Sequence, residues 1–544
     1  MRIVFKFALI LLLPCAIFAE ILSYEELKDK PKSLAKDYYI YRLIDETKYD
    51  KKQIRALKQS GIYRNKGKLK KELDKIFPPV KPKDKCAGVG TKNILDANLT
   101  CIKARLYPAF IAKLPNETKL KLASKLEQNY PNLANRLIGF SKENPLAYFE
   151  SIGDSANFLS YYKYAEPKSL NLSGKNEALY TNLGANEDFY ATLQDLVINK
   201  KHKNFRIALL NANPSVATPK NAFLLGVNAV MFDEEKKAIE FFKTATKVEK
   251  SAHNADNAKF WVYLLSGDES VLKELANSAN YNIYSLYAKE LTGNKSISVI
   301  IPEPTADAPK NYDITDPFNW VRTKAKADKM SKAELIEFAK FFDTKATIGE
   351  YSYIMNKATG YKDNFYAMPF MEFIGDGDNH RKALLLAIGR QESRFIPGSV
   401  STSYALGMMQ FMPFVANDLG KKQLKMTNFD QDDMFKPQIA YKFANLHIDY
   451  LEKSLISPVF IAYAYNGGLG FTKRLLQRGD LFNKGKYEPF LSMELVTFAE
   501  SRDYGKKVLA NYIIYRQILE PTAKISVKEE LEKLLNPSLS DKIR

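Results

Sequence analysis

The chain has 544 residues, and at about 150 residues per domain it is long enough for three or four folded units. Hydrophobic residues make up 46% of it, aromatic residues 12%, and glycine only 25 positions, which is typical of a chain that is folded throughout rather than fibrous or disordered. The formal net charge of +19 favours an anionic partner: a nucleic acid in the cytoplasm, or an anionic polymer of the cell envelope if the chain is exported. Lysine-rich, solvated helix faces are the alternative explanation.

The first segment, 1–19, predicts export. Basic residues precede an unbroken apolar run over 7–18, which is the pattern of a secretory signal peptide, and cleavage is expected after Ala19. A transmembrane anchor is the competing interpretation, but the run is too short to span a bilayer. Lipidation of Cys15 is disfavoured because Pro14 fits a lipoprotein cleavage site poorly. The expected location of the mature protein is the periplasm.

Export also gives meaning to the remaining cysteines. Without the signal peptide only Cys86 and Cys101 remain, an even pair in an oxidising compartment, so we expect a disulfide between them. Between them, Asp96 stands two residues before Asn98 in an Asn-Leu-Thr triplet, which resembles the extended acceptor sequence of bacterial N-glycosylation. Asn98 is therefore a candidate glycosylation site.

The region 20–295 is predicted to be an α-superhelical domain. Apolar residues recur at helical spacing, with short breaks and few strand signals. The segments 222–230 and 235–248 form a predicted helical hairpin of the kind that stacks into a solenoid. No repeat period is evident, so we expect an irregular superhelix.

Two further domains are predicted after this region. A proline-rich stretch begins the segment 296–362, which continues as a small helical linker domain. The segment 363–544 is the predicted catalytic domain, and it ends in a polar tail over 526–544 to which the sequence assigns no function.

Glu392 is the candidate general acid. It follows the apolar run 383–388, which predicts a buried helix, and it stands four residues after Ile388, so its carboxyl continues the core-facing stripe. Loss of water and the negative end of the helix dipole both favour the protonated form. The alternative is that Glu392 is the polar end of a structural helix, with its carboxyl turned to solvent.

The elements that follow Glu392 change the balance between these interpretations. They are spaced along the chain in a fixed order: Gly407, Met408, Met409, Gln410 and Pro413, then Ala464, Tyr465, Asn466, Gly467 and Gly468, then Glu494, Glu500 and Tyr504. This ordered set resembles the catalytic domain of the large, superhelical soluble lytic murein transglycosylases, whose fold is similar to goose-type lysozyme. The resemblance implies a mainly α protein: a superhelix that can close into a ring, a helical linker domain, and a lysozyme-like α(+β) catalytic domain.

The resemblance also implies a reaction. Members of this family cleave the β-1,4 bond between N-acetylmuramic acid and N-acetylglucosamine in peptidoglycan and form 1,6-anhydromuramic acid ends, with one glutamate acting first as acid and then as base. Between Glu392 and Asp418 there is no other acidic residue, whereas hydrolytic glycosidases normally use two carboxylates. Glu488, Glu494 or Glu500 could supply a second one, so a hydrolytic muramidase stays open. A glycan-binding solenoid scaffold without activity is the third candidate.

Individual roles follow from the resemblance, residue by residue. Glu392 corresponds to the catalytic acid, and the residues that correspond to substrate-binding positions are Ser393, Ser401, Met409, Gln410, Tyr465, Asn466, Glu494 and Tyr504. The sequence departs from the family at several positions: Tyr404 and Gly468 stand where glycine and alanine are usual, Met408 where leucine is usual, and Ile396 where a polar residue is common.

Other kinds of site find little support in the sequence. The histidines at 202, 253, 380 and 447 are too scattered for a metal cluster, and the acidic segment 430–433 lacks the glycine and final glutamate of a calcium loop, so we expect it to cap the next helix. We expect no metal, no cofactor, no nucleic-acid partner and no stable membrane anchor. The expected partner of the monomer is the peptidoglycan glycan strand, with other cell-wall enzymes as further candidates.

Overall fold

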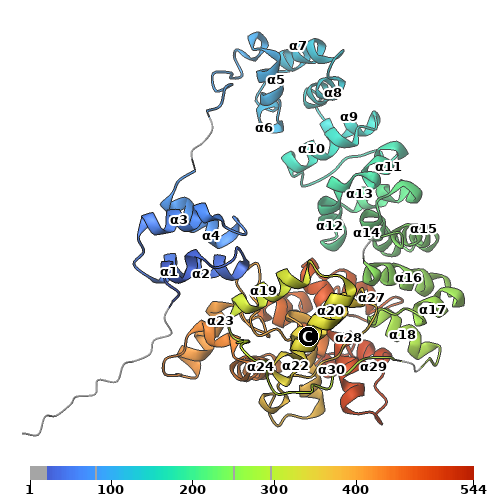
Figure 1. Cartoon of the computed structure of the whole chain (residues 1–544). Coiled ribbons are helices and arrows are strands. Elements are labelled where there is room, and N and C mark those ends of the chain that lie inside the picture. The colour runs from blue at the N-terminus through green and yellow to red at the C-terminus, as the bar shows by residue number, and fades with distance from the viewer. Residues whose placement is uncertain (1–20, 80–82, 249–250, 295–296) are drawn as a thin grey trace, which may run out of the picture. The chain divides into compact units, whose positions relative to one another are not determined.

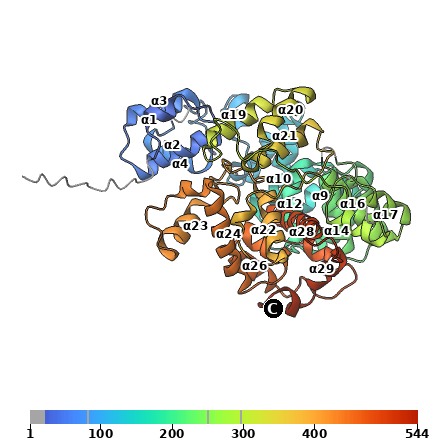
Figure 2. The same cartoon turned by 60° about the horizontal axis from the view of Figure 1, so that its bottom comes forward.

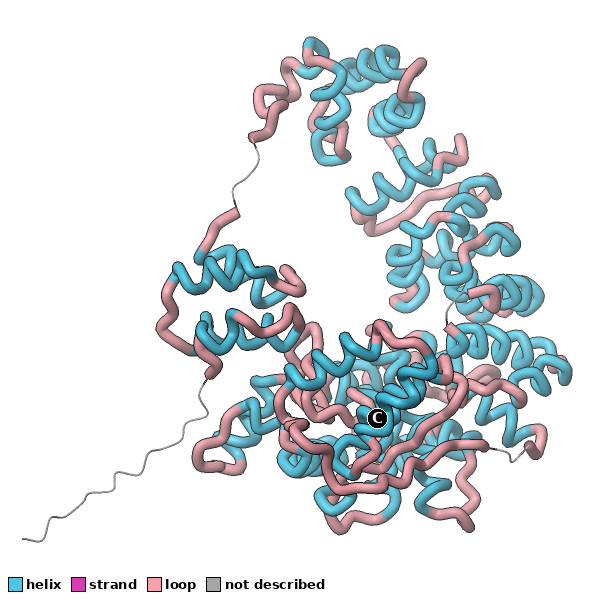
Figure 3. The backbone as a smooth tube through the Cα atoms, in the orientation of Figure 1, coloured by secondary structure: helices cyan, strands magenta, loops and turns pink. Residues whose placement is uncertain are grey.

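The computed structural model describes residues 21–79, 83–248, 251–294 and 297–544, so the predicted signal peptide lies outside the described residues. In these ranges every regular element is a helix, and β structure is limited to isolated bridges (Figure 3). The predicted mainly α fold is confirmed. No helix among the described residues is long and apolar enough to cross a bilayer.

The chain forms two compact units, and each is described by itself. The solenoid unit comprises 80–297, 451–513 and 524–544, and the Glu392 unit comprises 1–79, 298–450 and 514–523. The segment predicted as catalytic, 363–544, therefore contributes to both. Helices α24 (Pro437–Glu452) and α28 (Ala499–Leu519) each have residues in both units.

In the solenoid unit, helices that follow one another in sequence pack side by side, from α7 to α11 and from α14 to α18, and they form a curved row (Figure 1). The helices of this row are α5 (Leu99–Arg105), α6 (Pro108–Ile111), α7 (Asn116–Leu126), α8 (Pro131–Phe140), α9 (Pro145–Ser151), α10 (Ser155–Ala165), α11 (Glu177–Ala185), α12 (Tyr190–Ile198), α13 (Lys203–Ala208), α14 (Pro219–Val230), α15 (Glu235–Ala245), α16 (Ala252–Ser266), α17 (Glu269–Ala276) and α18 (Ile283–Leu291). Later segments add α25 (Pro458–Gly467), α26 (Leu469–Leu476), α27 (Phe490–Glu494), α29 (Val527–Lys533) and α30 (Pro537–Ser540).

The hairpin expected from the sequence is formed by α14 and α15. Thr218 caps α14 by accepting the Asn221 N–H, and Pro219 occupies the first helical position, where no N–H is needed. The two helices approach closely at Gly226, because a Cβ there would lie 2.9 Å from the Phe242 ring. That ring stacks on Trp261 of α16, with centroids 5.4 Å apart, so the hairpin is continued into the next helix by apolar packing.

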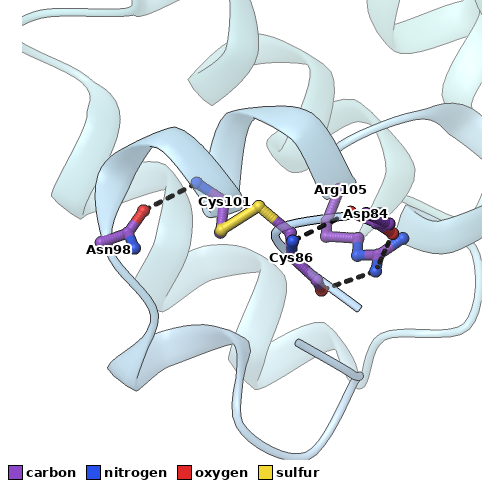
Figure 4. The surroundings of a disulfide bond; sticks show 5 residues. All are labelled: Asp84, Cys86, Asn98, Cys101 and Arg105. Atoms are coloured by element: carbon purple, nitrogen blue, oxygen red, sulfur yellow. Dashed lines mark hydrogen bonds and ion pairs between the residues drawn. A yellow bond between two sulfur atoms is a disulfide. The ribbon is translucent and has the colours of Figure 1, made fainter. Parts of the chain in front are cut away.

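A disulfide joins Cys86 and Cys101 near the start of the row (Figure 4). Cys101 lies in α5, whose N-cap is the exposed Asn98; the Asn98 side chain accepts the Cys101 N–H at 2.9 Å. Arg105 in the same helix donates to the Cys86 carbonyl at 2.6 Å and to Asp84 at 2.7 Å. The bridge and these polar contacts fix the non-helical segment around Cys86 to α5.

The Glu392 unit contains the first four helices of the chain, which the sequence had suggested as part of the superhelix. Its helices are α1 (Tyr24–Lys28), α2 (Leu34–Glu46), α3 (Lys51–Gly61), α4 (Gly67–Ile76), α19 (Pro317–Ala327), α20 (Lys332–Ala339), α21 (Ile348–Ala358), α22 (Asn379–Glu392) and α23 (Pro413–Asn417). Helix α2 packs against α19, as Figures 1 and 2 both show, and the Tyr39 ring stacks on Phe318 with centroids 5.8 Å apart. Helices α20 and α21 pack around a small apolar core that includes Leu335, Phe342 and Ile354.

The disulfide yields the first prediction. Replacement of both Cys86 and Cys101 by alanine should destabilise the solenoid unit by about 3 kcal/mol, because a bridge across a sequence separation of 15 restricts the unfolded chain. Urea unfolding of the oxidised protein and of the double variant measures the difference. Equal midpoints, or two free thiols on alkylation of the unfolded and unreduced protein, would contradict the prediction.

Candidate functional site

Helix α22 carries Glu392 as its last residue. Asp378 caps the helix by accepting the Arg381 N–H at 2.8 Å, and all residues from 383 to 389 are buried. The buried stretch fixes the position of the helix, and Glu392 emerges half-buried at its C-terminal end.

Ser393 connects this helix end to a neighbouring loop. Its hydroxyl donates to the Met408 carbonyl at 2.8 Å and accepts the Ile396 N–H at 3.0 Å. The single O–H donor of Ser393 is therefore used within the protein. The structure therefore gives Ser393 a positioning contact beside the acid, and its predicted contact with substrate stays a prediction.

The 399–411 loop brings the other three predicted residues of this unit together. The Ser401 hydroxyl accepts the N–H groups of Ser403 and Ala405, at 3.2 and 2.9 Å, and so shapes the turn. Gln410 adopts a φ of +50° and donates through Nε2 to the Gly407 carbonyl at 2.7 Å. Isolated bridges link Leu406 to Val400 and to Phe411, so the loop is held as a compact hairpin-like segment.

Met409 lies under α22 and is fully buried. A Cβ on Gly389, one turn before Glu392, would lie 3.2 Å from the Met409 sulfur and 2.8 Å from the Phe395 ring. Glycine at 389 therefore permits the close approach of the loop to the helix. The sequence showed this glycine but gave no reason for it, because the residues that crowd it come from two later segments.

The solenoid unit holds the remaining predicted residues. Tyr465 and Asn466 are half-buried in the last turn of α25, and Tyr504 is buried in α28. Asn466 is bound by two side chains at the start of α28: it accepts the Ser501 hydroxyl at 2.7 Å and donates to Glu500 at 3.4 Å. These bonds orient the Asn466 amide. The spacing in the sequence did not indicate them.

Glu494 is buried at the end of α27, and its Oε1 accepts from three side chains. Lys506, only 1% exposed, donates at 2.7 Å, Asn257 of α16 at 3.0 Å and the Tyr284 hydroxyl of α18 at 3.2 Å. Burial acts to raise the pKa of Glu494, but the positive charges of Lys506 and Arg502 and the Asn257 bond outweigh it and hold the pKa below its ordinary value. The carboxylate is therefore an ionised anchor that joins α27 and α28 to the helical row. Its predicted substrate contact stays a prediction.

The predicted site residues thus fall into two groups. Glu392, Ser393, Ser401, Met409 and Gln410 lie in the Glu392 unit, at the end of α22 and in the 399–411 loop that is bonded to it, and Tyr465, Asn466, Glu494 and Tyr504 lie in the solenoid unit. Among the described residues, no group of three or more His, Cys, Asp or Glu side chains is arranged to hold a metal ion. The acidic segment 430–433 caps the helical turn Gln431–Phe435, as the sequence predicted, because the Asp430 side chain accepts the Asp432 N–H at 2.9 Å.

Comparison with known proteins defines the class of this domain. Residues 371–487 match the family model described as the transglycosylase SLT domain. This match contains α22, the 399–411 loop and the end of α25. The part of the chain that the sequence predicted as catalytic is therefore similar to an established domain family.

Curated relatives extend the match to named proteins. A Haemophilus influenzae relative of the soluble lytic murein transglycosylase class is 31% identical over 159 residues, which are 29% of this chain and 26% of that protein. The soluble lytic murein transglycosylases of Salmonella typhimurium and Escherichia coli are each 23% identical over 213 residues, 38% of this chain and 32% of theirs. The matched regions thus span about a quarter to a third of the length of these relatives. Over the matched region the chain is similar to the soluble lytic murein transglycosylases.

Solved structures of this class also match. The lytic transglycosylase Slt of Pseudomonas aeruginosa, solved as an inactive mutant, is 14% identical, with a TM-score of 0.48 over 91% of this chain and 80% of that one. The 70 kDa soluble lytic transglycosylase of Escherichia coli is 16% identical, with a TM-score of 0.43 over 91% and 88% of the two chains.

The anchor role of Glu494 gives the second prediction. Glu494→Gln should lower the free energy of unfolding of the solenoid unit by about 3–5 kcal/mol near neutral pH, because it leaves the Lys506 ammonium buried without its counter-charge. Since the folded pKa of Glu494 is lowered, its contribution is present above the ordinary value of 4.5 and is lost as the pH falls below it. Urea unfolding at several pH values measures both effects.

Glu117→Gln is the matched control for this prediction. Glu117 pairs with Lys121 on an exposed surface of α7, where solvent screens a salt bridge and its contribution to stability is small. An equal loss of stability in both variants would contradict the anchor role.

Proposed function

We propose that this protein cleaves the β-1,4 bond between N-acetylmuramic acid and N-acetylglucosamine in peptidoglycan by transglycosylation, with Glu392 as acid and then as base. The observation that carries the proposal is the position of Glu392. It is the half-buried last residue of α22 within the matched SLT domain, and the residue after it is bonded to the loop that bears Met409 and Gln410.

The proposed reaction needs one carboxyl group. Protonated Glu392 donates its proton to the glycosidic oxygen, and the bond from that oxygen to C1 of the muramic acid breaks. The oxygen of the sugar's own C6 hydroxyl then bonds to C1, and its proton passes to the Glu392 carboxylate, which restores the acid. The product is a 1,6-anhydromuramic acid end and no water is consumed. The contribution of the protein is to hold the sugar and keep the pocket dry.

The surroundings of the other carboxyl groups support a single-acid reaction. Glu494 is ionised and bonded to Lys506, Asn257 and Tyr284. Glu500 bonds to Asn466, and Glu488 accepts the Ser492 N–H at 3.1 Å. Each glutamate that could act as a second catalytic carboxylate is thus bonded to other groups of the protein. This favours transglycosylation over hydrolysis by a carboxylate pair.

Binding of the glycan is proposed to involve the residues that correspond to the family's sugar site. In the Glu392 unit these are Ser393, Ser401, Met409 and Gln410, and in the solenoid unit they are Tyr465, Asn466, Glu494 and Tyr504. The proposed location is the periplasm, where the predicted signal peptide would deliver the chain and where the Cys86–Cys101 bridge is compatible with the redox conditions. The basic composition suits an anionic envelope polymer as the partner.

The third prediction concerns the product. Digestion of purified peptidoglycan should release muropeptides that are lighter by one water than the products of a hydrolytic muramidase, because the new end is an internal ether. Mass spectrometry of the digest identifies them. Hydrated, reducible ends alone would favour the hydrolytic muramidase, and the absence of cleavage would favour the glycan-binding scaffold.

The fourth prediction concerns the acid. Glu392→Gln should keep the fold and reduce the cleavage rate at least about 100-fold, since the amide has a similar size but cannot donate the proton. The rate of release of soluble muropeptides measures the loss, and thermal unfolding checks the fold. Glu372→Gln is the control, because Glu372 is an exposed carboxylate in the same domain. Turnover of Glu392→Gln within tenfold of wild type, with unchanged unfolding, would show that another group is the acid.

A further inference from the structure

Helix α2 presents a buried polar face to the rest of the Glu392 unit. Tyr38 and Arg42, one turn apart, are each only 1% exposed. Tyr38 donates its hydroxyl proton to Asp432 at 2.6 Å, and Gln431 donates to the Tyr38 oxygen at 3.0 Å. A helix near the start of the chain is thus bound to a segment almost 400 residues later by groups that are out of water.

Arg42 is the centre of this contact. Its guanidinium forms a two-bond pair with Asp430, at 2.9 and 2.7 Å, a second pair with Glu46 of its own helix at 2.9 Å, and an ion pair with Asp432 at 2.9 Å. A planar guanidinium that is bonded on both edges has a fixed direction. The 430–432 segment is therefore held in one position relative to α2.

The same helix face also holds the 399–411 loop, through Tyr404. The Tyr404 ring is 5% exposed, and its centroid lies 5.8 Å from that of Tyr38 and 5.7 Å from that of Tyr41. Its backbone φ is +66°, a region in which a bulky side chain is strained and glycine is not. The strain persists because the aromatic packing on α2 offsets it.

A third contact connects the two segments that α2 holds. Gly407 lies directly against the Met434 carbonyl, since a Cβ on Gly407 would be 1.9 Å from that oxygen. The 399–411 loop is thus fixed by α2 at Tyr404 and by the 430–435 segment at Gly407. Next to Gly407, the Met408 carbonyl accepts the Ser393 hydroxyl, and Ser393 directly follows Glu392 at the end of α22. These contacts form a continuous path from α2 to the acid.

We propose that Tyr404 is a positioning residue. Its packing on helix α2 holds the 399–411 loop, which bears the proposed sugar-binding residues, in position next to Glu392. Tyr404 acts through the loop and its packing on Tyr38 and Tyr41, and it need not touch the glycan. The inference rests on the proposed function for its effect on turnover. It also assigns a role to the first helices of the chain, which supply none of the predicted site residues.

The test compares Tyr404→Gly and Tyr404→Phe in the full mature chain. Tyr404→Gly removes the ring and the backbone strain together, so the chain folds but the loop loses its contact with α2. We expect kcat/KM on a soluble glycan oligomer to fall about tenfold, mainly through KM, because a misplaced binding loop loses substrate contacts. Tyr404→Phe keeps the ring and should stay within about twofold of wild type.

A double-variant cycle tests whether the effect passes through α2. Tyr41→Ala removes one of the two packing partners and should give a partial loss in the same direction. If Tyr404 acts through α2, then Tyr41→Ala combined with Tyr404→Gly is no worse than Tyr404→Gly alone. Losses that multiply, or a kcat/KM of Tyr404→Gly within about twofold of wild type, would overturn the proposal.

Ile354→Val separates positioning from stability. It removes a methyl group from the apolar core around α20 and α21, which does not include α2 or the 399–411 loop. We expect Ile354→Val to lower the unfolding temperature and to keep kcat/KM. A loss of activity in Ile354→Val equal to that of Tyr404→Gly would mean that the effect is one of stability alone, and would overturn the proposal.

Hydrogen exchange gives a readout that does not depend on the reaction. In wild type the Leu406 N–H donates to Phe411 and the Gly407 N–H to Ser399, both at 2.9 Å, so these amides should be protected. Tyr404→Gly and Tyr41→Ala should speed their exchange, whereas Ile354→Val should not; unchanged exchange in Tyr404→Gly would overturn the proposal. A wild-type protein without any turnover would instead contradict the proposed function, and the exchange rates would still decide the coupling.

Discussion

The bond between the Ser393 hydroxyl and the Met408 carbonyl is the contact on which the candidate site depends. It joins the end of a buried helix to the 399–411 loop. The same loop also packs on this helix through Met409, which lies close to Gly389. With these two contacts, the acid and the loop that carries Met409 and Gln410 form one rigid arrangement. The proposed general acid catalysis on a bound sugar needs groups that are held in fixed positions.

Each of the two units contains a buried ion pair that fixes its helices, and neither pair includes the proposed acid. Arg42 with Asp430 attaches the first helices to the Glu392 unit, and Lys506 with Glu494 attaches α28 to the end of α27. Buried pairs of this kind add little stability compared with apolar packing, but they are costly to break and they fix position. The proposed catalytic role of Glu392 is separate from both pairs.

The sequence predicted the helices whose positions follow from the spacing of nearby apolar residues. Apolar spacing predicted the α14–α15 hairpin, and the apolar run before Glu392 predicted a buried helix that ends at the acid. The partners of Glu494 could not be predicted, because Asn257 precedes it by 237 residues and a charge gives no local sign of its partner. The grouping of the first helices with the Glu392 unit was missed for the same reason. Tyr404 was visible only as a departure from a family pattern.

The central claim is that Glu392 alone catalyses formation of the bond between the C6 oxygen and C1 of the muramic acid, without water. Digestion of peptidoglycan by the wild-type protein in water enriched in ¹⁸O, followed by mass spectrometry of the new glycan ends, tests it most directly. We predict anhydro ends that carry no ¹⁸O, because the C6 hydroxyl supplies the oxygen that bonds to C1. One ¹⁸O atom at each new end would show hydrolysis and contradict the account.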